Sequence, residues 1–227
     1  MREKIAKILP EYSWLPLTVC IVFDLLVFYA TRPITAGWHH YDISVALDAK
    51  IPFIPAFIVI YILSYVQWGL GFLTVGRESR DFCFRYIFAS LVSRFICLII
   101  FIVLPTAMTR PDVPGKDIFS WMTSFIYSVD TPDNLFPSIH CVESTFFAYT
   151  VFRSRKVKPA LKWINLFFTV SVYFAVLFVK QHLVLDVIAG IIITFIGIII
   201  AHYVRPERFF LTGEKETEKT LIQEKNS

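Results

Sequence analysis

The chain has 227 residues, of which 56% are hydrophobic, 17% are aromatic and only 18% are charged. Its mean hydropathy is +0.62 and its net charge is +4. A soluble domain of this size does not need so much apolar surface, so the composition excludes an ordinary soluble protein and predicts an integral membrane protein. We expect no nucleic-acid partner.

Five apolar runs are long enough to cross a bilayer, because an α-helix needs about 20 residues to span a hydrocarbon core of about 30 Å. In chain order they cover residues 15–34, 51–75, 86–108, 162–179 and 183–204. After the third run, residues 117–129 are amphipathic and predict a short helix at the membrane interface. The polar residues 211–227 predict a disordered tail, which leaves residues 1–210 as a single membrane domain.

Basic residues are distributed unevenly over the segments between these runs. One set of alternate segments contains Arg2, Lys4, Lys7, Arg77, Arg80, Arg85, Arg153, Arg155, Lys156, Lys158, Lys162, Arg205 and Arg208. The opposite set contains only Arg32, Lys50, Arg110, Lys116 and Lys180. Because cytoplasmic segments are enriched in lysine and arginine, we expect the first set, and with it both chain termini, to be cytoplasmic.

This orientation requires a sixth crossing. The segment 110–133 is then outside the cytoplasm and the segment 153–162 is inside it, so the chain must cross the membrane between them. The piece available is 138–152, which contains His140 and Glu143. Ionisable side chains inside a membrane are costly and usually face the interior of a helix bundle as part of a functional site. The sequence therefore predicts an all-α fold, a six-helix transmembrane bundle whose fourth helix carries polar groups on its inner face.

Residues with catalytic potential gather at the extracytoplasmic ends of these helices. His140 begins the fourth crossing, and His182 and Asp186 lie where the fifth run gives way to the sixth. In a helix, the i,i+4 spacing places Asp186 on the same face as His182. A carboxylate that binds one imidazole nitrogen fixes the tautomer and leaves the other nitrogen free as a nucleophile.

The start of the fourth crossing is also suited to binding an anion. Pro137 and Ser138 favour a helix start, where free backbone amides and the helix dipole attract negative charge. Ser138 adds a hydroxyl donor, and Arg110 and Lys180 add positive charge. A second histidine, His140, can protonate a leaving oxygen. Together these residues predict phosphoryl transfer through a phosphohistidine.

The sequence Pro-Ser-Ile-His at 137–140, followed by His-x3-Asp at 182–186, resembles the type 2 phosphatidic acid phosphatase superfamily. The resemblance covers the third to the sixth crossing, and its motifs lie within residues 105–205. The resemblance implies that His182 attacks phosphorus and that Asp186 orients it. It also implies that His140 is the general acid and Ser138 a phosphate ligand, without a metal or other cofactor.

The same resemblance implies a substrate and a location. The substrate would be a lipid phosphate, such as a phosphatidate or an isoprenoid phosphate, that comes sideways from the bilayer. The active site would face the extracytoplasmic side of the membrane, which we expect to be the plasma membrane. The sequence predicts no particular oligomeric state.

Four positions depart from the family pattern. Ile139 stands where the family has glycine, a substitution associated with its inositol-phosphorylceramide-synthase-like branch. Ala175 and Val176 stand in place of a Ser-Arg pair, and Val103 in place of the lysine that precedes Arg110. These departures leave three functions open: a lipid phosphatase, a phosphotransferase with a lipid hydroxyl as acceptor, and a catalytically inactive lipid carrier or scaffold.

Other polar residues within or beside the apolar runs have structural interpretations. Glu143 could orient His140 or pair with a basic residue such as Arg94, and we favour a structural role. We expect Asp24 and Arg94 to face the bundle interior. The adjacent His39 and His40 suggest a zinc site, but neighbouring side chains point in different directions, which favours a solvated loop or lid.

Overall fold

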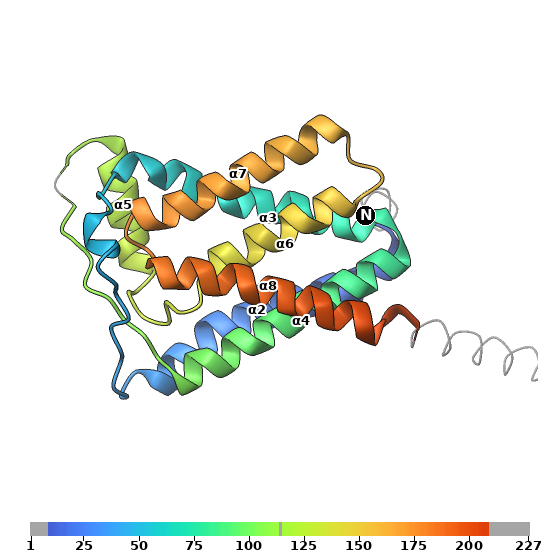
Figure 1. The fold of residues 1–227 in the computed structure, drawn as a ribbon, viewed down its shortest axis with the longest axis horizontal. Helices are drawn as coiled ribbons and strands as arrows, with labels where there is room; N and C mark the ends of the chain where they lie inside the picture. Colours follow the sequence, from blue (N-terminus) through green and yellow to red (C-terminus); the bar gives the residue numbers. More distant parts are fainter. Residues whose placement is uncertain (1–8, 114, 209–227) are drawn as a thin grey trace, which may run out of the picture.

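The computed structural model describes residues 9–113 and 115–208, and this part of the chain is helical apart from loops and isolated β-bridges (Figure 1). Its α-helices are α2 (Glu11–Thr35), α3 (Ile58–Glu78), α4 (Arg80–Val103), α5 (Ile118–Val129), α6 (Ile139–Arg153), α7 (Pro159–Phe178) and α8 (Val184–Val204). Two short 3-10 helices, η1 (Asp48–Lys50) and η2 (Pro55–Phe57), lie between α2 and α3. The predicted tail 211–227 and the basic residues before residue 9 lie outside the described residues.

Five stretches are long and apolar enough to cross a membrane: α2, residues Pro55–Glu78, α4, α7 and α8. They correspond to the five apolar runs of the sequence, which confirms the all-helical membrane fold. The sixth expected crossing, α6, has 15 residues and so a length of about 22 Å. It is shorter than a hydrocarbon core of about 30 Å, and a sixth crossing stays a prediction.

Capping residues and prolines explain where the helix ends differ from the predicted ones. α3 begins only after residues 51–57, because Pro52 and Pro55 lack the amide that a continuous helix needs. α4 begins earlier than residue 86, because the Ser79 side chain caps it by accepting a hydrogen bond from the Phe82 amide at 3.2 Å. It also ends earlier than predicted, just before Pro105 disfavours the helical conformation.

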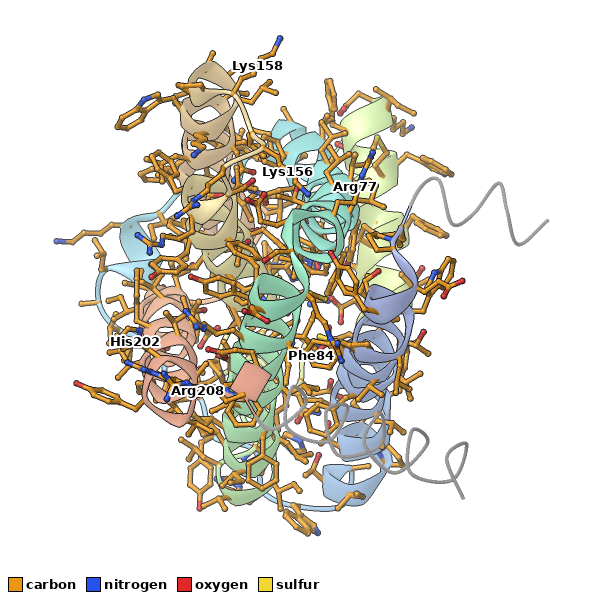
Figure 2. The ribbon with its side chains drawn as sticks, turned by 90° about the vertical axis from the view of Figure 1, so that its right-hand side faces the viewer. Arg77, Phe84, Lys156, Lys158, His202 and Arg208 are labelled. Carbon is orange, nitrogen blue, oxygen red and sulfur yellow. The ribbon has the colours of Figure 1, made fainter. Side chains whose placement is uncertain are left out.

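Successive long helices, with α6 among them, run in alternating directions, so the bundle has two distinct ends (Figure 1). The loop end carries α5 and the loops 36–57, 104–117, 130–138 and 179–183. The basic end carries the α3–α4 and α6–α7 junctions, the start of α2 and the end of α8. Arg77, Lys156, Lys158 and Arg208 gather there (Figure 2). Cations are therefore concentrated at the end where the sequence predicts them.

α6 lies in the centre of the bundle, in contact with α3, α7 and α8. Nearly all of its side chains from His140 to Val151 are buried, including Glu143, which is 1% exposed. Its polar side chains therefore contact protein rather than lipid, which is the condition under which such groups are tolerated at membrane depth.

A close approach of α8 to α6 positions the catalytic candidates. A Cβ atom at Gly190 would lie 2.8 Å from the backbone oxygen of Ser138, so only glycine allows this spacing. Next to this contact, the Ser138 amide donates a hydrogen bond of 3.1 Å to the backbone oxygen of Asp186. The first turns of α6 and α8 are thus fixed to each other.

Candidate functional site

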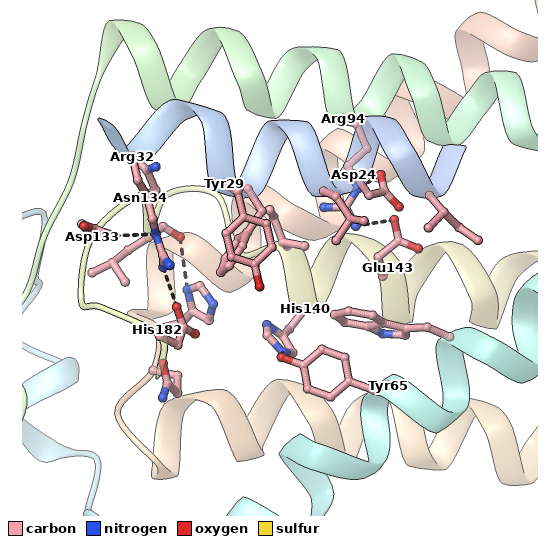
Figure 3. Close-up of a pocket in the computed structure, with 18 of the residues that line it drawn as sticks. Asp24, Tyr29, Arg32, Tyr65, Arg94, Asp133, Asn134, His140, Glu143 and His182 are labelled. Carbon is pink, nitrogen blue, oxygen red and sulfur yellow. Dashed lines mark hydrogen bonds and ion pairs between the residues drawn. The ribbon is translucent and has the colours of Figure 1, made fainter. Parts of the chain in front are cut away.

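A cavity of about 290 Å³ lies inside the loop end of the bundle. Its walls come from α2, α3, α4 and α6, from the loops 104–117 and 130–138, and from the α7–α8 junction. His140 and His182 both line it, from opposite sides of the same space (Figure 3). Two histidines that are 42 residues apart in the sequence therefore share one cavity.

The ring of His182 is held from one side by two acceptors. Its Nδ1 atom lies 3.1 Å from the backbone oxygen of Leu135 and 3.3 Å from Oδ2 of Asp186. Both neighbours can only accept, so Nδ1 must carry the proton, and Nε2 keeps a lone pair. Asp186 is fully buried and its Oδ2 atom also accepts from the Leu183 amide at 2.8 Å. The arrangement fixes the orientation of the imidazole and leaves Nε2 out of these contacts.

His140 lies in an aromatic enclosure. Its ring stacks on Tyr61 with centroids 4.2 Å apart, and the rings of Tyr65 and Trp68 lie 5.4 and 5.0 Å away. Its Nε2 atom is 3.2 Å from the Tyr65 hydroxyl, and only 5% of the residue is exposed. The centroids of the His140 and His182 rings are 6.0 Å apart, so both rings border the same part of the cavity.

Ser138 and Lys180 do not line this cavity. The Ser138 hydroxyl is buried and caps α6, accepting a hydrogen bond of 3.3 Å from the Cys141 amide. The Lys180 ammonium donates to the backbone oxygens of Asp48 and Ile51 at 3.0 and 2.6 Å, and burial lowers its pKa. Both residues therefore already have protein partners.

Arg110, the third basic or hydroxyl candidate for binding phosphate, does line the cavity. Its guanidinium donates to the backbone oxygen of Asp130 and to the side-chain oxygen of Gln181, and it lies 4.6 Å from the Tyr127 ring centroid. Burial lowers its pKa, against the opposing effect of Asp130, but an arginine stays charged at neutral pH. A fixed cation thus lies at the outer part of the cavity.

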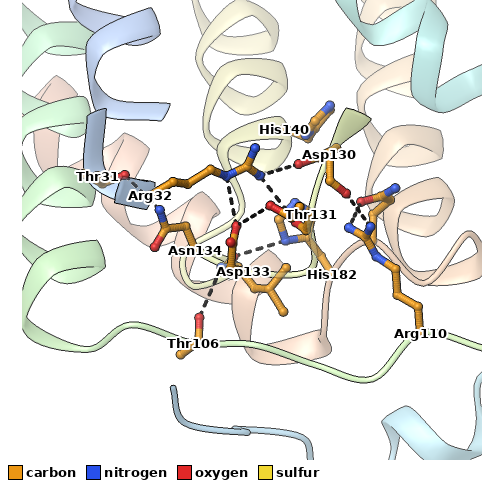
Figure 4. Close-up of polar contacts among 12 residues, drawn as sticks. Thr31, Arg32, Thr106, Arg110, Asp130, Thr131, Asp133, Asn134, His140 and His182 are labelled. Atoms are coloured by element: carbon orange, nitrogen blue, oxygen red, sulfur yellow. Dashed lines mark hydrogen bonds and ion pairs between the residues drawn. The ribbon is translucent and has the colours of Figure 1, made fainter. Parts of the chain in front are cut away.

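Arg32, in the last turn of α2, is a second cation of the cavity wall, and no motif in the sequence predicted a role for it. It forms ion pairs with Asp130 at 2.5 Å and Asp133 at 2.9 Å (Figure 4). The signal that could have identified it was its position at the same membrane side as Arg110.

The loop 130–138 contains Leu135, whose backbone oxygen contacts the His182 ring. Several hydrogen bonds fix the position of this loop. The Asn134 amide group donates to the Thr31 hydroxyl at 2.8 Å, and the Thr106 hydroxyl accepts from the amides of Leu135 and Phe136 at 3.2 and 2.9 Å (Figure 4). Together with the Arg32 ion pairs, these bonds tie the loop to α2 and to the chain that follows α4. No sequence motif predicts these contacts.

At its inner end the cavity is lined by a buried ion-pair cluster. Arg94 on α4 lies 2.8 Å from Asp24 on α2 and 2.5 Å from Glu143 on α6 (Figure 3). Arg94 and Glu143 are each 1% exposed. Of the two interpretations of Glu143, the ion pair with Arg94 is therefore the one that forms, and Asp24 and Arg94 do face the bundle interior.

The cavity reaches the outer surface of the bundle between α2 and α3. Leu25 and Tyr29 on α2 and Tyr65 on α3 line the cavity, and each is about half exposed, at 52%, 61% and 47%. In a membrane protein, this surface faces lipid. The lining of the cavity therefore includes side chains that are exposed on the surface of the bundle.

His39 and His40, in the loop after α2, do not line the cavity. Nδ1 of His40 donates a hydrogen bond of 3.0 Å to the backbone oxygen of Trp38, because that oxygen can only accept. His39 packs edge-on against Tyr41. Within the described residues, no group of three or more His, Cys, Asp or Glu side chains is arranged to hold a metal ion.

Comparisons with curated proteins and with solved structures found no match. A family model described as PAP2 superfamily matches residues 37–200, a range that includes both histidines, Asp186 and Arg110. The chain therefore belongs to the PAP2 superfamily, a family of phosphatase- and phosphotransferase-type enzymes, and is an integral membrane protein.

Proposed function

We propose that the protein hydrolyses a lipid phosphate through a phosphohistidine formed on His182. The observation that carries this proposal is the geometry of His182: Nδ1 is bound by Asp186 and Leu135, and Nε2 is left as a lone-pair nucleophile beside a second histidine. Family membership supports the same reaction type. The lipid tail would occupy the α2–α3 opening, and the phosphate would lie between the two imidazole rings.

In the proposed reaction, Nε2 of His182 attacks phosphorus while the bond to the lipid oxygen breaks. His140, protonated at the start, gives its proton to that oxygen, and the lipid alcohol leaves. Water then attacks phosphorus and gives a proton to His140 as general base, the phosphorus–nitrogen bond to His182 breaks, and inorganic phosphate is released. Asp186 stabilises the positive charge that develops on His182 during attack.

Positive charge at the outer part of the cavity would stabilise the phosphate in the transition state. Arg110 and Arg32 are the cations that line the cavity there, from two different parts of the chain. They offer a physical substitute for the family's Ser-Arg pair, which is Ala175-Val176 here. Lys180 is less suited to this role, because its ammonium binds backbone oxygens of the loop 48–51.

The test is phosphate release by the purified protein from a panel of lipid phosphates. The His182→Ala variant should lose phosphate release, and Asp186→Asn should lower kcat by roughly 10²- to 10⁴-fold while the protein remains folded. After brief incubation with a lipid whose phosphate is radiolabelled, the wild-type protein should carry an acid-labile phosphoryl label. The His182→Ala protein should carry none. If both variants retain wild-type turnover, the proposed mechanism is wrong.

A phosphotransferase is the second candidate, and the enclosure of His140 favours it. Tyr61, Tyr65 and Trp68 surround that ring and leave 5% of the residue exposed, and Ile139 adds an apolar wall. Such a site restricts water and suits a lipid hydroxyl as acceptor. Adding diacylglycerol or ceramide to the assay distinguishes the two: headgroup transfer without free phosphate identifies the transferase. An inactive carrier or scaffold would show neither.

We further propose that the loop end faces the extracytoplasmic side and that the basic end faces the cytoplasm. The concentration of lysine and arginine at the basic end supports this orientation through the positive-inside rule (Figure 2).

A further inference from the structure

The buried cluster of Asp24, Arg94 and Glu143 at the inner end of the cavity is not used by the proposed reaction. Its one arginine contacts two carboxyl groups, and the hydrogen-bonding capacity of the cluster is incomplete. Within the described residues, Nη1 of Arg94 and Oε2 of Glu143 are buried and have no hydrogen-bond partner. Buried polar groups are nearly always paired, so a donor and an acceptor left open beside a cavity indicate a missing ligand group.

The position of the cluster relative to the histidines defines which part of a ligand would reach it. Glu143 follows His140 by three residues on α6, so it lies about 4.5 Å further along the helix axis, on the same face. A lipid with its phosphorus between the histidines places its first few backbone atoms at this depth. Its hydrocarbon tails would lie beyond, against the apolar residues of α2 and α3.

The two open atoms require opposite partners. Nη1 of Arg94 donates and needs an acceptor, whereas Oε2 of Glu143 accepts and needs a donor. A hydroxyl group or an amide supplies both at once. An ester carbonyl supplies only the acceptor, and an isoprenoid chain supplies neither.

We propose that Arg94 and Glu143 form a specificity site that binds a hydroxyl or amide on the lipid backbone next to the phosphate. This inference rests on the proposed function, because it assumes that the phosphate lies between His140 and His182. It predicts a substrate preference in the order ceramide 1-phosphate, then phosphatidate, then polyisoprenyl phosphate. Asp24 is a positioning residue that holds the Arg94 guanidinium through its Nε atom.

The first test measures kcat/KM for these three lipids in the wild type and in Glu143→Gln. Glutamine keeps an oxygen for Arg94 but converts the open acceptor into an N–H donor. The ratio of ceramide 1-phosphate to phosphatidate should therefore fall by roughly 10- to 100-fold, because a hydrogen bond to a charged group is lost and an ester carbonyl gains a donor. Glu11→Gln, the same chemical change at the exposed start of α2, is the matched control and should leave the ratio unchanged.

The second test does not depend on turnover. Two proteins are compared, the His182→Ala single variant and the His182→Ala, Glu143→Gln double variant. For each, the rise in unfolding temperature is measured with ceramide, diacylglycerol or polyprenol. Ceramide should stabilise the single variant most, and the double variant should lose that advantage. Equal stabilisation by all three alcohols, or an unchanged kcat/KM ratio in a folded Glu143→Gln protein, overturns the specificity site. Either result leaves the catalytic proposal standing, which His182→Ala turnover alone decides.

Discussion

At the scale of single residues, the site separates groups that already have protein partners from groups that remain open to a ligand. His182 uses Nδ1 for Asp186 and Leu135, and its Nε2 remains available. The Pro-Ser-x-His and His-x3-Asp spacings predicted the two histidines and Asp186 as one site, and the structure places the two imidazole rings on one cavity. They could not show which cations line the cavity, because that depends on loop contacts between distant segments, such as Arg32 with Asp130 and Asp133.

Alanine substitution of the two basic candidates should have different effects. Arg110→Ala removes a buried cation of the cavity wall, and kcat/KM for a lipid phosphate should fall by about 10²-fold or more. Lys180→Ala removes hydrogen bonds to Asp48 and Ile51, so it should lower thermal stability and change kcat/KM little. The measurement is steady-state kinetics together with thermal unfolding of both variants in detergent. A larger kinetic loss for Lys180→Ala than for Arg110→Ala would reassign the phosphate-binding cation.

At the scale of helices, apolar length predicted five of the elements, and capping residues explain most shifts at their ends. α6 is the element that hydropathy could not detect, because it is short and polar. It was found from the alternation of basic segments, and its burial among α3, α7 and α8 explains its composition. The close spacing of α6 and α8 could not be predicted from the sequence. It depends on Gly190, a single glycine in an otherwise ordinary apolar run.

Gly190→Ala should therefore disturb the site without touching a catalytic group. The added methyl group would overlap the Ser138 backbone oxygen, so α8 must move away from α6 at a cost of about 1–3 kcal/mol. Thermal unfolding should show the lower stability, and activity should fall because the two histidines separate. Gly69→Ala on α3 is the matched control. Nothing lies within 4 Å of a Cβ atom there, so stability should stay the same or rise.

The ion pair between Arg85 and Glu207 fixes the segment after α8 to the start of α4. Burial alone would raise the pKa of Glu207, but the hydrogen bonds from Arg85 outweigh it, and the pKa lies below its ordinary value of 4.5. Because the folded-state pKa is lowered, the contribution to stability is present above about pH 4.5 and is lost as the pH falls through the lowered value.

Glu207→Gln should thus destabilise the protein at pH 7 by at most about 1 kcal/mol, because Arg85 is partly exposed. The difference in thermal stability between wild type and variant should shrink as the pH is lowered below about 4. A difference that is constant between pH 7 and pH 3.5 would show that Glu207 contributes through packing rather than charge.

At the scale of the whole molecule, the loops of one end surround the candidate site, and the proposed orientation depends on the cations of the other end. Trp38 lies at the loop end and is 48% exposed, and Lys158 lies at the basic end. The four native cysteines are buried, so introduced cysteines can be labelled against a low background. Trp38→Cys should react with a membrane-impermeant maleimide in intact cells, and Lys158→Cys only after permeabilisation. The reverse pattern would invert the proposed orientation.

The opening between α2 and α3 has a consequence for how kinetics must be expressed. A lipid that reaches the histidines through this opening is drawn from the two-dimensional phase around the protein, so the rate depends on the mole fraction of substrate in that phase. Diluting mixed micelles with buffer should leave the velocity unchanged, whereas adding pure detergent at constant bulk substrate should reduce it.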